Sequence, residues 1–286
     1  MTPQAAIAAA RRSFHAELLR NVLRVEKGVP NNADKDNANS VKLATAILRQ
    51  IPGKAQKGKL QGQQTGSRFE TACENFVKAT LPLLNHLRPG KWHAEKVSSR
   101  SKIAIARFDQ FSHLDALAQA AKQSRELAAI LGSDYVITPD LIVYRSPEED
   151  ATINAKRLLV DSEIARYTPL RSINDSPPTL HASISCKWTI RSDRVQNIRS
   201  EALNLVRNRK GRLPHIVSVV AEPLPSRIES IALGTGDIDC VYHFALPELQ
   251  KAVAGLGLAE VSESLDTMVT GHRLRDIGDL PLDLVI

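Results

Sequence analysis

Aromatic and cysteine residues are scarce in this sequence of 286 residues. Trp, Tyr and Phe together make up 4% of the chain, too few for the stacking platform on which single-stranded nucleic acids bind. The three cysteines, Cys73, Cys186 and Cys240, lie far apart and form no C-x-x-C pair. That spacing excludes a zinc-ribbon pattern and a disulfide framework, and it favours buried thiols in a reducing cytoplasm.

Long apolar runs are also missing. No uninterrupted stretch approaches the roughly 20 residues that a membrane-spanning helix needs. The basic pair Arg11 and Arg12 follows the first apolar stretch, which reverses the order of a signal peptide. We therefore expect a cytoplasmic protein that has no membrane partner.

The remaining composition is that of a core-forming protein, with 43% apolar and 24% charged residues. We expect residues 1–286 to form a single domain, since this length suits one large core. The 38 Lys and Arg residues exceed the 31 Asp and Glu residues, which gives a net charge of +7. A basic excess of this size permits a polyanionic partner.

Helical and strand patterns alternate along the chain, which predicts an α/β fold with a mixed central β-sheet flanked by helices. The expected helices cover 3–27, 40–51, 67–87, 110–131, 194–209, 226–233 and 246–255. The expected strands cover 91–106, 134–144, 179–190, 215–221 and 238–244.

The segment 53–66 contains four glycines and the lysines Lys54, Lys57 and Lys59, which is typical of a mobile basic loop. Its start nearly matches a phosphate-binding P-loop. However, Leu60 stands where that loop needs a hydroxyl residue, and no hydrophobic strand comes before it. The sequence therefore excludes a P-loop NTPase.

Two carboxylates and one lysine are expected to converge from neighbouring elements. Asp140 follows Pro139 in a predicted strand, Lys187 ends another strand, and Glu201 lies on the helix after it. Mg²⁺ prefers oxygen ligands, and a lysine can orient a water or stabilise developing negative charge, so the set suits hydrolysis of a phosphodiester. The spacing alone also fits an ordinary α/β protein.

A second motif, Arg191-Ser192-Asp193-Arg194, begins four residues after Lys187, at a predicted strand-to-helix junction. Arginine can bind guanine through O6 and N7, and aspartate can accept a hydrogen bond from cytosine N4. Ser192 or Asp193 could instead be a helix N-cap beside solvated arginines. The two interpretations are compatible.

Together, Pro139-Asp140, Ser185-Cys186-Lys187, the Arg-Ser-Asp-Arg motif and Glu201 resemble the CCGG-recognising restriction endonucleases of the PD-(D/E)xK superfamily. The resemblance implies a restriction-endonuclease-like fold and two Mg²⁺ ions per active site. Asp140, Glu201 and the Cys186 carbonyl would be the metal ligands. Ser185 replaces the usual acidic residue of the motif, and Glu201 would supply the missing carboxylate.

The resemblance also implies roles for residues outside the motif. It places Glu70 near the active site together with Ser185, although Ser67 and Glu70 fit a helix capping box equally well. It assigns the outer base pair to Asp34 and Arg227, and a minor-groove contact to Gln63. Taken alone, Asp34 is a typical turn residue in a polar loop.

The implied activity is that of a type II restriction endonuclease, which cleaves double-stranded DNA at G^CCGGC and leaves a four-base 5′ overhang. A palindromic site requires a protein with two-fold symmetry, and the resemblance raises the expected dimer to a homotetramer that binds two sites. Two alternatives stay open. One is a PD-(D/E)xK nuclease of DNA repair or recombination, and the other is a DNA-binding protein that does not cleave.

The basic excess gathers around the proposed recognition helix. Seven cations lie on it or directly after it, and phosphate contacts by such residues would make DNA affinity fall steeply with salt. They are Arg191, Arg194, Arg199, Arg207, Arg209, Lys210 and Arg212.

Overall fold

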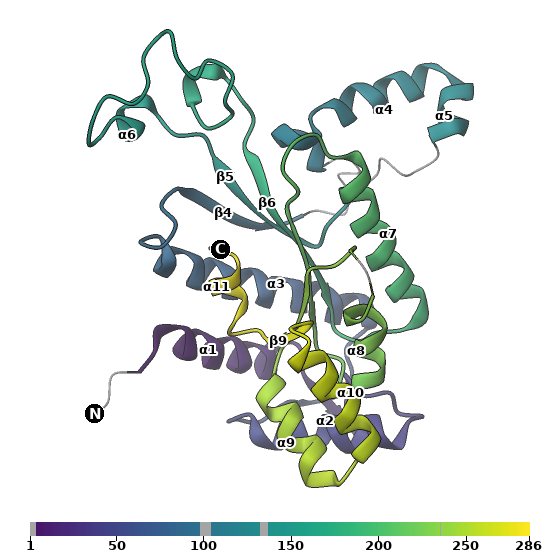
Figure 1. Cartoon of the computed structure of the whole chain (residues 1–286). Helices are drawn as coiled ribbons and strands as arrows, with labels where there is room; N and C mark the ends of the chain where they lie inside the picture. The colour runs from purple at the N-terminus through teal and green to yellow at the C-terminus, as the bar shows by residue number, and fades with distance from the viewer. Residues whose placement is uncertain (1–3, 98–103, 132–136, 235) are drawn as a thin grey trace.

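A six-stranded mixed sheet forms the centre of the computed structural model, which describes residues 4–97, 104–131, 137–234 and 236–286 (Figure 1). Its spatial order is β4-β5-β6-β7-β8-β9, antiparallel from β4 to β6 and parallel from β6 to β9. This arrangement confirms the expected fold class. The strands are Lys91–Lys96, Leu141–Ser146, Thr179–Lys187, His215–Val220, Cys240–His243 and Leu274–Asp276.

Helices cover both faces of this sheet. Every residue of β6 from Leu180 to Cys186 is therefore buried, whichever face its side chain is on. In Figure 1, α1 (Ala6–Asn21) and α3 (Gly62–Thr80) run along one side, and α7 (Ser192–Asn208) and α8 (Pro225–Ala232) stand on the other. The remaining longer helices are α2 (Ala38–Gln50), α4 (His113–Gln123), α5 (Arg125–Leu131), α9 (Leu246–Leu256) and α10 (Ala259–Thr270).

Most predicted elements occur, with some shifted ends. The helix expected over 110–131 is divided at Ser124 into α4 and α5. Strands joined by a turn were expected over 91–106, and the described part holds one strand, which ends at Lys96. Residues 98–103 lie outside the described part of the chain, and Ala104–Arg107 is a short 3₁₀ helix. The sequence patterns predicted neither α10 nor β9, nor the last short helix α11 (Leu280–Asp283).

The first predicted helix is too long, since α1 ends at Asn21 and a small hairpin follows. Strands β1 (Arg24–Glu26) and β2 (Val29–Pro30) are joined by Lys27 and Gly28, which have φ values of 50° and 83°. Two central residues with positive φ make the tight turn that suits a hairpin. Strand β3 (Gln56–Lys57) pairs with β1, so part of the predicted basic loop is a sheet edge.

The capping box predicted for Ser67 and Glu70 is wrong. Helix α3 begins at Gly62, so Ser67 lies inside the helix and its hydroxyl accepts a hydrogen bond from Lys96 Nζ at 2.7 Å. The helix extends this far because Thr65, Phe69 and Phe76 continue one buried face along it. The predicted loop therefore ends at Gln61, five residues before Gly66.

The segment between β5 and β6 projects from one end of the sheet (Figure 1). It contains α6 (Asp150–Ile153) and the 3₁₀ helix η4 (Ser172–Asn174). Five of its large apolar side chains are more than half exposed: Leu158, Leu159, Ile164, Tyr167 and Ile173. No helix among the described residues is long and apolar enough to cross a membrane.

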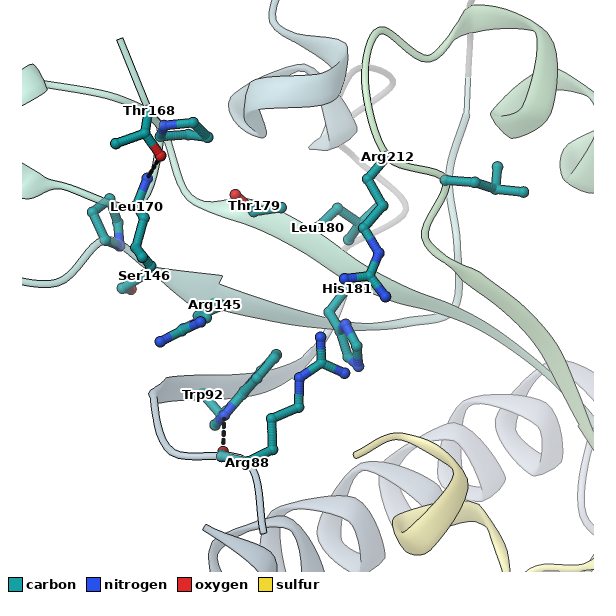
Figure 2. A pocket seen from close by; sticks show the side chains of 13 residues that line it. Arg88, Trp92, Arg145, Ser146, Thr168, Leu170, Thr179, Leu180, His181 and Arg212 are labelled. Atoms are coloured by element: carbon teal, nitrogen blue, oxygen red, sulfur yellow. Dashed lines mark hydrogen bonds between the residues drawn. The ribbon is translucent and has the colours of Figure 1, made fainter. Parts of the chain in front are cut away.

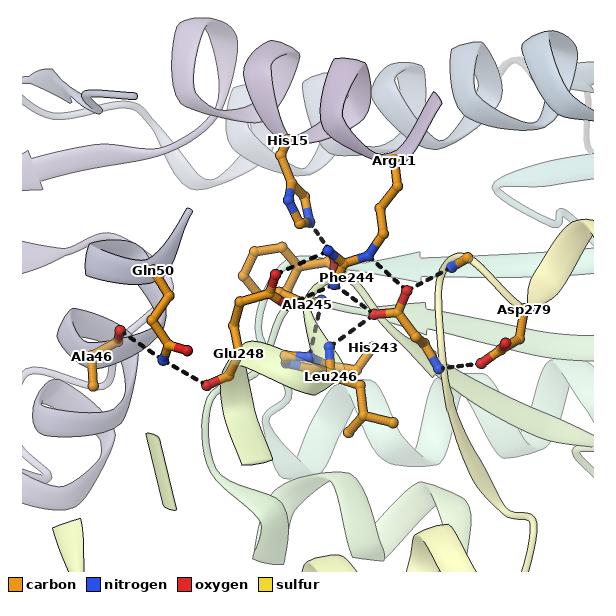
Figure 3. Close-up of polar contacts among 12 residues, drawn as sticks. Arg11, His15, Ala46, Gln50, His243, Phe244, Ala245, Leu246, Glu248 and Asp279 are labelled. Carbon is orange, nitrogen blue, oxygen red and sulfur yellow. Dashed lines mark hydrogen bonds and ion pairs between the residues drawn. The ribbon is translucent and has the colours of Figure 1, made fainter. Parts of the chain in front are cut away.

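Arg11 fastens α1 to the far edge of the sheet (Figure 3). Its guanidinium donates to both carboxylate oxygens of Glu248 on α9, at 2.9 and 2.6 Å. It also donates to Asp276 of β9, at 2.7 and 2.8 Å. Two paired carboxylates around one arginine thus hold the chain's first helix against its last strand.

We expect Arg11→Met to lower the free energy of unfolding by about 2 kcal/mol, because it leaves two partly buried carboxylates unpaired. Arg12→Met removes the same charge from an exposed neighbour and should change it by less than about 0.5 kcal/mol. Urea unfolding followed by circular dichroism would measure both. Equal losses in the two variants would contradict this role for Arg11.

Candidate active site

The motif residues meet where β6 ends. Strand β5 is antiparallel to β6, with Leu141 opposite Ile184, so Asp140 just before β5 lies beside the last residues of β6. The Asp140 Oδ2 atom accepts hydrogen bonds from the Cys186 backbone N–H at 2.8 Å and from Lys187 Nζ at 2.5 Å. The Ser185 hydroxyl lies 3.5 Å from the same oxygen. Among the described residues, none donates to Oδ1.

Lys187 is held in its charged form. Burial opposes the charge, but the carboxylates of Asp140 and Glu201 raise the pKa of Lys187 above its ordinary value. Cys186 is held neutral, because a hydrogen bond with Cys73 and its own burial raise the pKa of the Cys186 thiol. The cation can therefore act on negative charge, while the thiol is neither a nucleophile nor a thiolate ligand.

Glu201 reaches this pair from α7. Burial, followed by the nearby carboxylate of Asp140, raises the pKa of Glu201 to about 8, and Lys187 only partly opposes this shift. Two carboxylates thus share a partly buried space with one ammonium group. The acidic groups in this space therefore outnumber the cations.

This deficit is what a divalent cation would relieve. The available donors are the carboxylate oxygens of Asp140 and Glu201 and the backbone carbonyl of Cys186, and hard oxygen donors suit Mg²⁺. No group of three His, Cys, Asp or Glu side chains gathers as a metal site in the described part of the chain. A set of two carboxylates and one carbonyl agrees with that result, so the residues fit Mg²⁺.

Several of the predicted site residues line two hollows that share Gln63 and Glu70, and we call the two together the central cleft. One half, of about 660 Å³, is lined by Asp34, Gln63, Lys187, Arg191 and Arg227. The other half, of about 690 Å³, is lined by Asp140, Thr138 and Lys96. Gln63 and Glu70 line both halves. Segments more than 190 residues apart in sequence therefore share one hollow.

Glu70 projects from α3 into this cleft, with an ion pair to Lys96 Nζ at 2.8 Å. Glu74, one helical turn later, accepts a hydrogen bond from the Lys96 backbone N–H at 3.2 Å and pairs with Lys78. These contacts give α3 an acidic edge that faces Asp140 across the cleft. They agree with the active-site position expected for Glu70.

Asp34 and Arg227 are paired with each other on the other side of the cleft. Arg227 Nη2 donates to Asp34 Oδ2, and this hydrogen bond, followed by one from the Asp36 backbone, lowers the pKa of Asp34. Arg191 lies close enough to contribute to the same shift. The arginine and the carboxylate that were predicted to read one base pair are therefore adjacent and satisfy each other.

The Arg-Ser-Asp-Arg motif is only partly described. Arg191 occupies the N-cap position of α7, so Ser192 and Asp193 are not the N-cap. The backbone of residues 192–194 forms the first turn of α7, and the side chains of Ser192, Asp193 and Arg194 lie outside the described part of the structure. Arg191 itself lines the central cleft.

Part of the predicted basic cluster does not face this cleft. Arg199 is bound to Asp237 at 2.7 Å and to two backbone carbonyls. Arg212 lines a separate pocket at the opposite end of β6. The reason is geometric, because a helix of 17 residues spans about 25 Å and carries its last residues away from the cleft.

Comparison with known proteins identifies the family. Residues 14–286 match the family described as NgoMIV restriction enzyme. The chain is 54% identical over 278 residues to the type II restriction enzyme NgoMIV of Neisseria gonorrhoeae. The aligned residues cover 96% of this chain and 97% of that protein. This chain belongs to the NgoMIV restriction enzyme family. The resemblance that the motifs predicted is confirmed, and the mixed sheet agrees with it.

The sequence patterns missed two buried polar residues that hold the cleft together. Glu222 is fully buried and accepts the backbone N–H of Ile190 at 2.9 Å and of Leu224 at 3.2 Å. Asn32 donates to the Ala221 carbonyl at 2.9 Å. Glu222 thereby joins the turn before Arg191 to the start of α8, and Asn32 fixes the loop that carries Asp34.

The position of Glu222 in the sequence could have indicated that it lies near the site. It follows the predicted strand 215–221 directly, and the carboxyl end of that strand lies beside the end of β6, because β6 and β7 are parallel. An acidic residue at that point belongs to the same edge of the sheet as Lys187. Glu74 has a signal too, since residues four apart on a helix share a face.

We expect Glu201→Gln to flatten the pH dependence of stability in the metal-free protein. Because the pKa of Glu201 is raised from 4.5 to about 8, the folded state favours its protonated form. Its contribution to folding is complete below pH 4.5 and is lost as the pH rises through about 8. Between about pH 5 and about pH 9, the wild type should lose on the order of 3 kcal/mol more than Glu201→Gln.

Thermal or urea unfolding in EDTA would measure this difference. Glu260→Gln, which changes the same charge at an exposed position of α10, is the matched control. It should follow the wild-type profile. If Glu201→Gln also followed that profile, Glu201 would not carry the excess charge of the cleft.

Proposed function

We propose that this chain is a Mg²⁺-dependent type II restriction endonuclease that cleaves double-stranded DNA at G^CCGGC. Membership of a restriction-enzyme family makes site-specific DNA cleavage its activity. One observation carries the finer proposal: the central cleft holds the Asp140–Lys187 pair in the same hollow as Arg191 and the Asp34–Arg227 pair. Groups suited to hydrolysis and groups suited to base recognition therefore face one substrate-sized space.

Asp140, Glu201 and the Cys186 carbonyl would hold Mg²⁺, with two ions per active site as the family resemblance implies. When bound there, Mg²⁺ would neutralise charge on the scissile phosphate and would lower the pKa of a bound water. The backbone N–H of Cys186 and Lys187 Nζ both bind Asp140 Oδ2 and so orient its other oxygen toward the cleft. Ser185 supports the same carboxylate through its hydroxyl.

Lys187 supplies a fixed positive charge. Its ammonium is held protonated by Asp140 and Glu201, so it donates rather than accepts a proton in the resting site. In that form it stabilises the negative charge that develops on the phosphate and orients the attacking water. Glu70 lies on the opposite wall with Lys96, where it can accept a hydrogen bond from a water in the cleft.

Recognition follows from the same cleft. We assign the inner CCGG bases to Arg191, Ser192, Asp193 and Arg194, through guanine O6 and N7 and cytosine N4. We assign the outer pair to Arg227 and Asp34, which hold each other until a base pair replaces the contact. Gln63, in the first turn of α3, would reach the minor groove.

Cleavage and recognition are expected to be coupled through the backbone. Only three residues separate Lys187 from Arg191, and the Glu222 carboxylate binds the N–H of the last of them, Ile190. Because this connection is short and anchored, Arg191 and Lys187 can move little relative to each other. A wrong base at the arginine would therefore displace the phosphate from the lysine.

A palindromic site calls for two copies of the chain, and we propose a homotetramer built from two such dimers. The projecting segment between β5 and β6 supports further assembly. Tyr167 is 92% exposed and Leu158 77% exposed there, and clustered exposed apolar side chains are typical of an interface. We propose that this segment contacts another copy of the chain.

We assign the enzyme to the cytoplasm of a bacterial cell, where duplex DNA is its substrate. The three cysteines are free and buried, as is usual in a reducing compartment.

Lys187→Ala should bind a duplex containing GCCGGC within a few-fold of wild-type affinity but cleave it at least about 10²-fold more slowly, because one charge that stabilises the reaction is lost. Gel shift without Mg²⁺ and single-turnover cleavage with Mg²⁺ would measure the two effects. Lys251→Ala, at an exposed position of α9, should leave both unchanged. Normal cleavage by Lys187→Ala would remove that lysine from the mechanism.

Arg227→Ala should reduce discrimination at the outer base pair by about 1–3 kcal/mol, since a guanine contact is lost while the inner contacts remain. The measurement is the ratio of cleavage rates on GCCGGC and ACCGGT duplexes. Arg191→Ala should instead slow cleavage of both duplexes. If Arg227→Ala slowed both equally, Arg227 would be a phosphate contact rather than a base contact.

A further inference from the structure

A second concave site lies at the opposite end of the strands from the central cleft. This pocket, which we call the basic pocket, has a volume of about 150 Å³. Three arginines line it, Arg88, Arg145 and Arg212, together with Trp92 and His181 (Figure 2). Figure 2 shows the guanidinium groups of Arg88 and Arg212 directed toward His181 from two sides.

The lining carries positive charge and no carboxylate. No Asp or Glu is among the residues that line the basic pocket. Burial, followed by repulsion from Arg212 and Arg145, lowers the pKa of Arg88. Burial also lowers the pKa of His181 to about 3, with Arg88 and Arg212 contributing. The arginines are therefore close enough to repel one another.

Internal partners satisfy only part of this charge. Arg88 Nη1 donates to the Ile286 carbonyl at 2.6 Å, and Arg145 Nη2 lies 3.3 Å from Glu148. The Nε atom of Arg145 is buried without a hydrogen-bond partner. Arg212 makes no hydrogen bond or ion pair through its guanidinium with any described residue. Donors therefore outnumber acceptors around the hollow.

The remaining polar lining can also donate. Thr168 and Thr179 add hydroxyls to the lining, and the Thr168 oxygen accepts the Leu170 N–H at 3.3 Å, which leaves its own proton to donate. The Ser146 hydroxyl is instead hydrogen-bonded to His93 at 2.9 Å. Trp92 holds the arginines in place, because Arg88 lies 5.2 Å and Arg145 5.7 Å from its ring centroid. Fixed donors around a small volume are the requirements of an oxyanion site.

The basic pocket is separate from the site that carries the proposed chemistry. His181 and Lys187 lie on the same strand β6, six residues apart, which corresponds to about 20 Å of extended chain. Arg145 and Asp140 lie at opposite ends of β5 in the same way. A ligand in the basic pocket would therefore not be the phosphate that is cleaved, and the inference does not rest on the proposed function.

We propose that the basic pocket binds one phosphate group, held by Arg88, Arg145 and Arg212 with the hydroxyls of Thr168 and Thr179. Its volume suits a single tetrahedral oxyanion and is too small for a nucleoside, since pockets for larger ligands start at about 300 Å³. The phosphate can belong to a small free ligand or to the backbone of a DNA duplex.

Titration of inorganic phosphate into the full-length protein at constant ionic strength, followed by calorimetry, tests the site. Arg212→Gln removes the guanidinium that has no described partner, and its exposed position makes misfolding an improbable cause of any change. Arg12→Gln changes the same charge on α1, away from the pocket. Saturable binding of one phosphate per chain is expected, weakened about tenfold or more by Arg212→Gln and unchanged by Arg12→Gln.

A second titration, with a short duplex that lacks CCGG, distinguishes the two sources of phosphate. If Arg212→Gln weakens phosphate binding alone, the pocket takes a free phosphate-bearing ligand. If it weakens duplex binding as well, and Arg12→Gln does not, the pocket takes a backbone phosphate. If the two variants behave alike with both probes, the phosphate senses only the net charge of the protein and the proposal is wrong.

Discussion

The carboxylate of Asp140, bound by Cys186 N–H and Lys187 Nζ, is the contact on which the rest of the central cleft depends. It joins the start of β5 to the end of β6, two strands whose antiparallel register alone brings these residues together. It also fixes the charge of Lys187, and through the space it shares with Glu201 it creates an acidic excess. One oxygen atom thus sets the position of the lysine and the need for a cation.

The side of the cleft to which we assign base recognition depends on a second buried carboxylate. Glu222 is not exposed at all, yet both of its oxygens accept backbone N–H groups, which compensates for its burial. Its contacts hold the turn before Arg191 and the start of α8 in one arrangement. The neighbouring ion pair of Asp34 with Arg227 fixes the side chain of Arg227 on the same side of the cleft.

The sequence predicted the parts of the fold that follow from local patterns. The strand expected over 179–190 and the helix expected over 67–87 both occur, as β6 and α3. The start of α3 was misjudged, because Gly62 and Gly66 suggest a loop while the buried positions Thr65 and Phe69 stabilise a helix. Tertiary contacts outweighed the local preference there.

The candidate site likewise contains residues that sequence motifs indicated and residues that no local pattern indicated. Asp140, Lys187 and Glu201 were proposed from the sequence because their motifs, taken together with the Arg-Ser-Asp-Arg motif, resemble those of a known family, whereas their spacing alone fits many α/β proteins. The pairing of Asp34 with Arg227, across 193 positions of sequence, came only from the family resemblance. Glu222, and the basic pocket with Arg88, depend on contacts between distant elements, and no local pattern marks them.

The most direct test is digestion of a plasmid carrying one GCCGGC site and several other CCGG sites, with and without Mg²⁺, followed by sequencing of the ends. The account predicts no cutting without Mg²⁺, and with Mg²⁺ discrete ends only at GCCGGC, cut before the first C on each strand. Cutting in EDTA, ends at other sequences, or binding without any cutting in Mg²⁺ would contradict it.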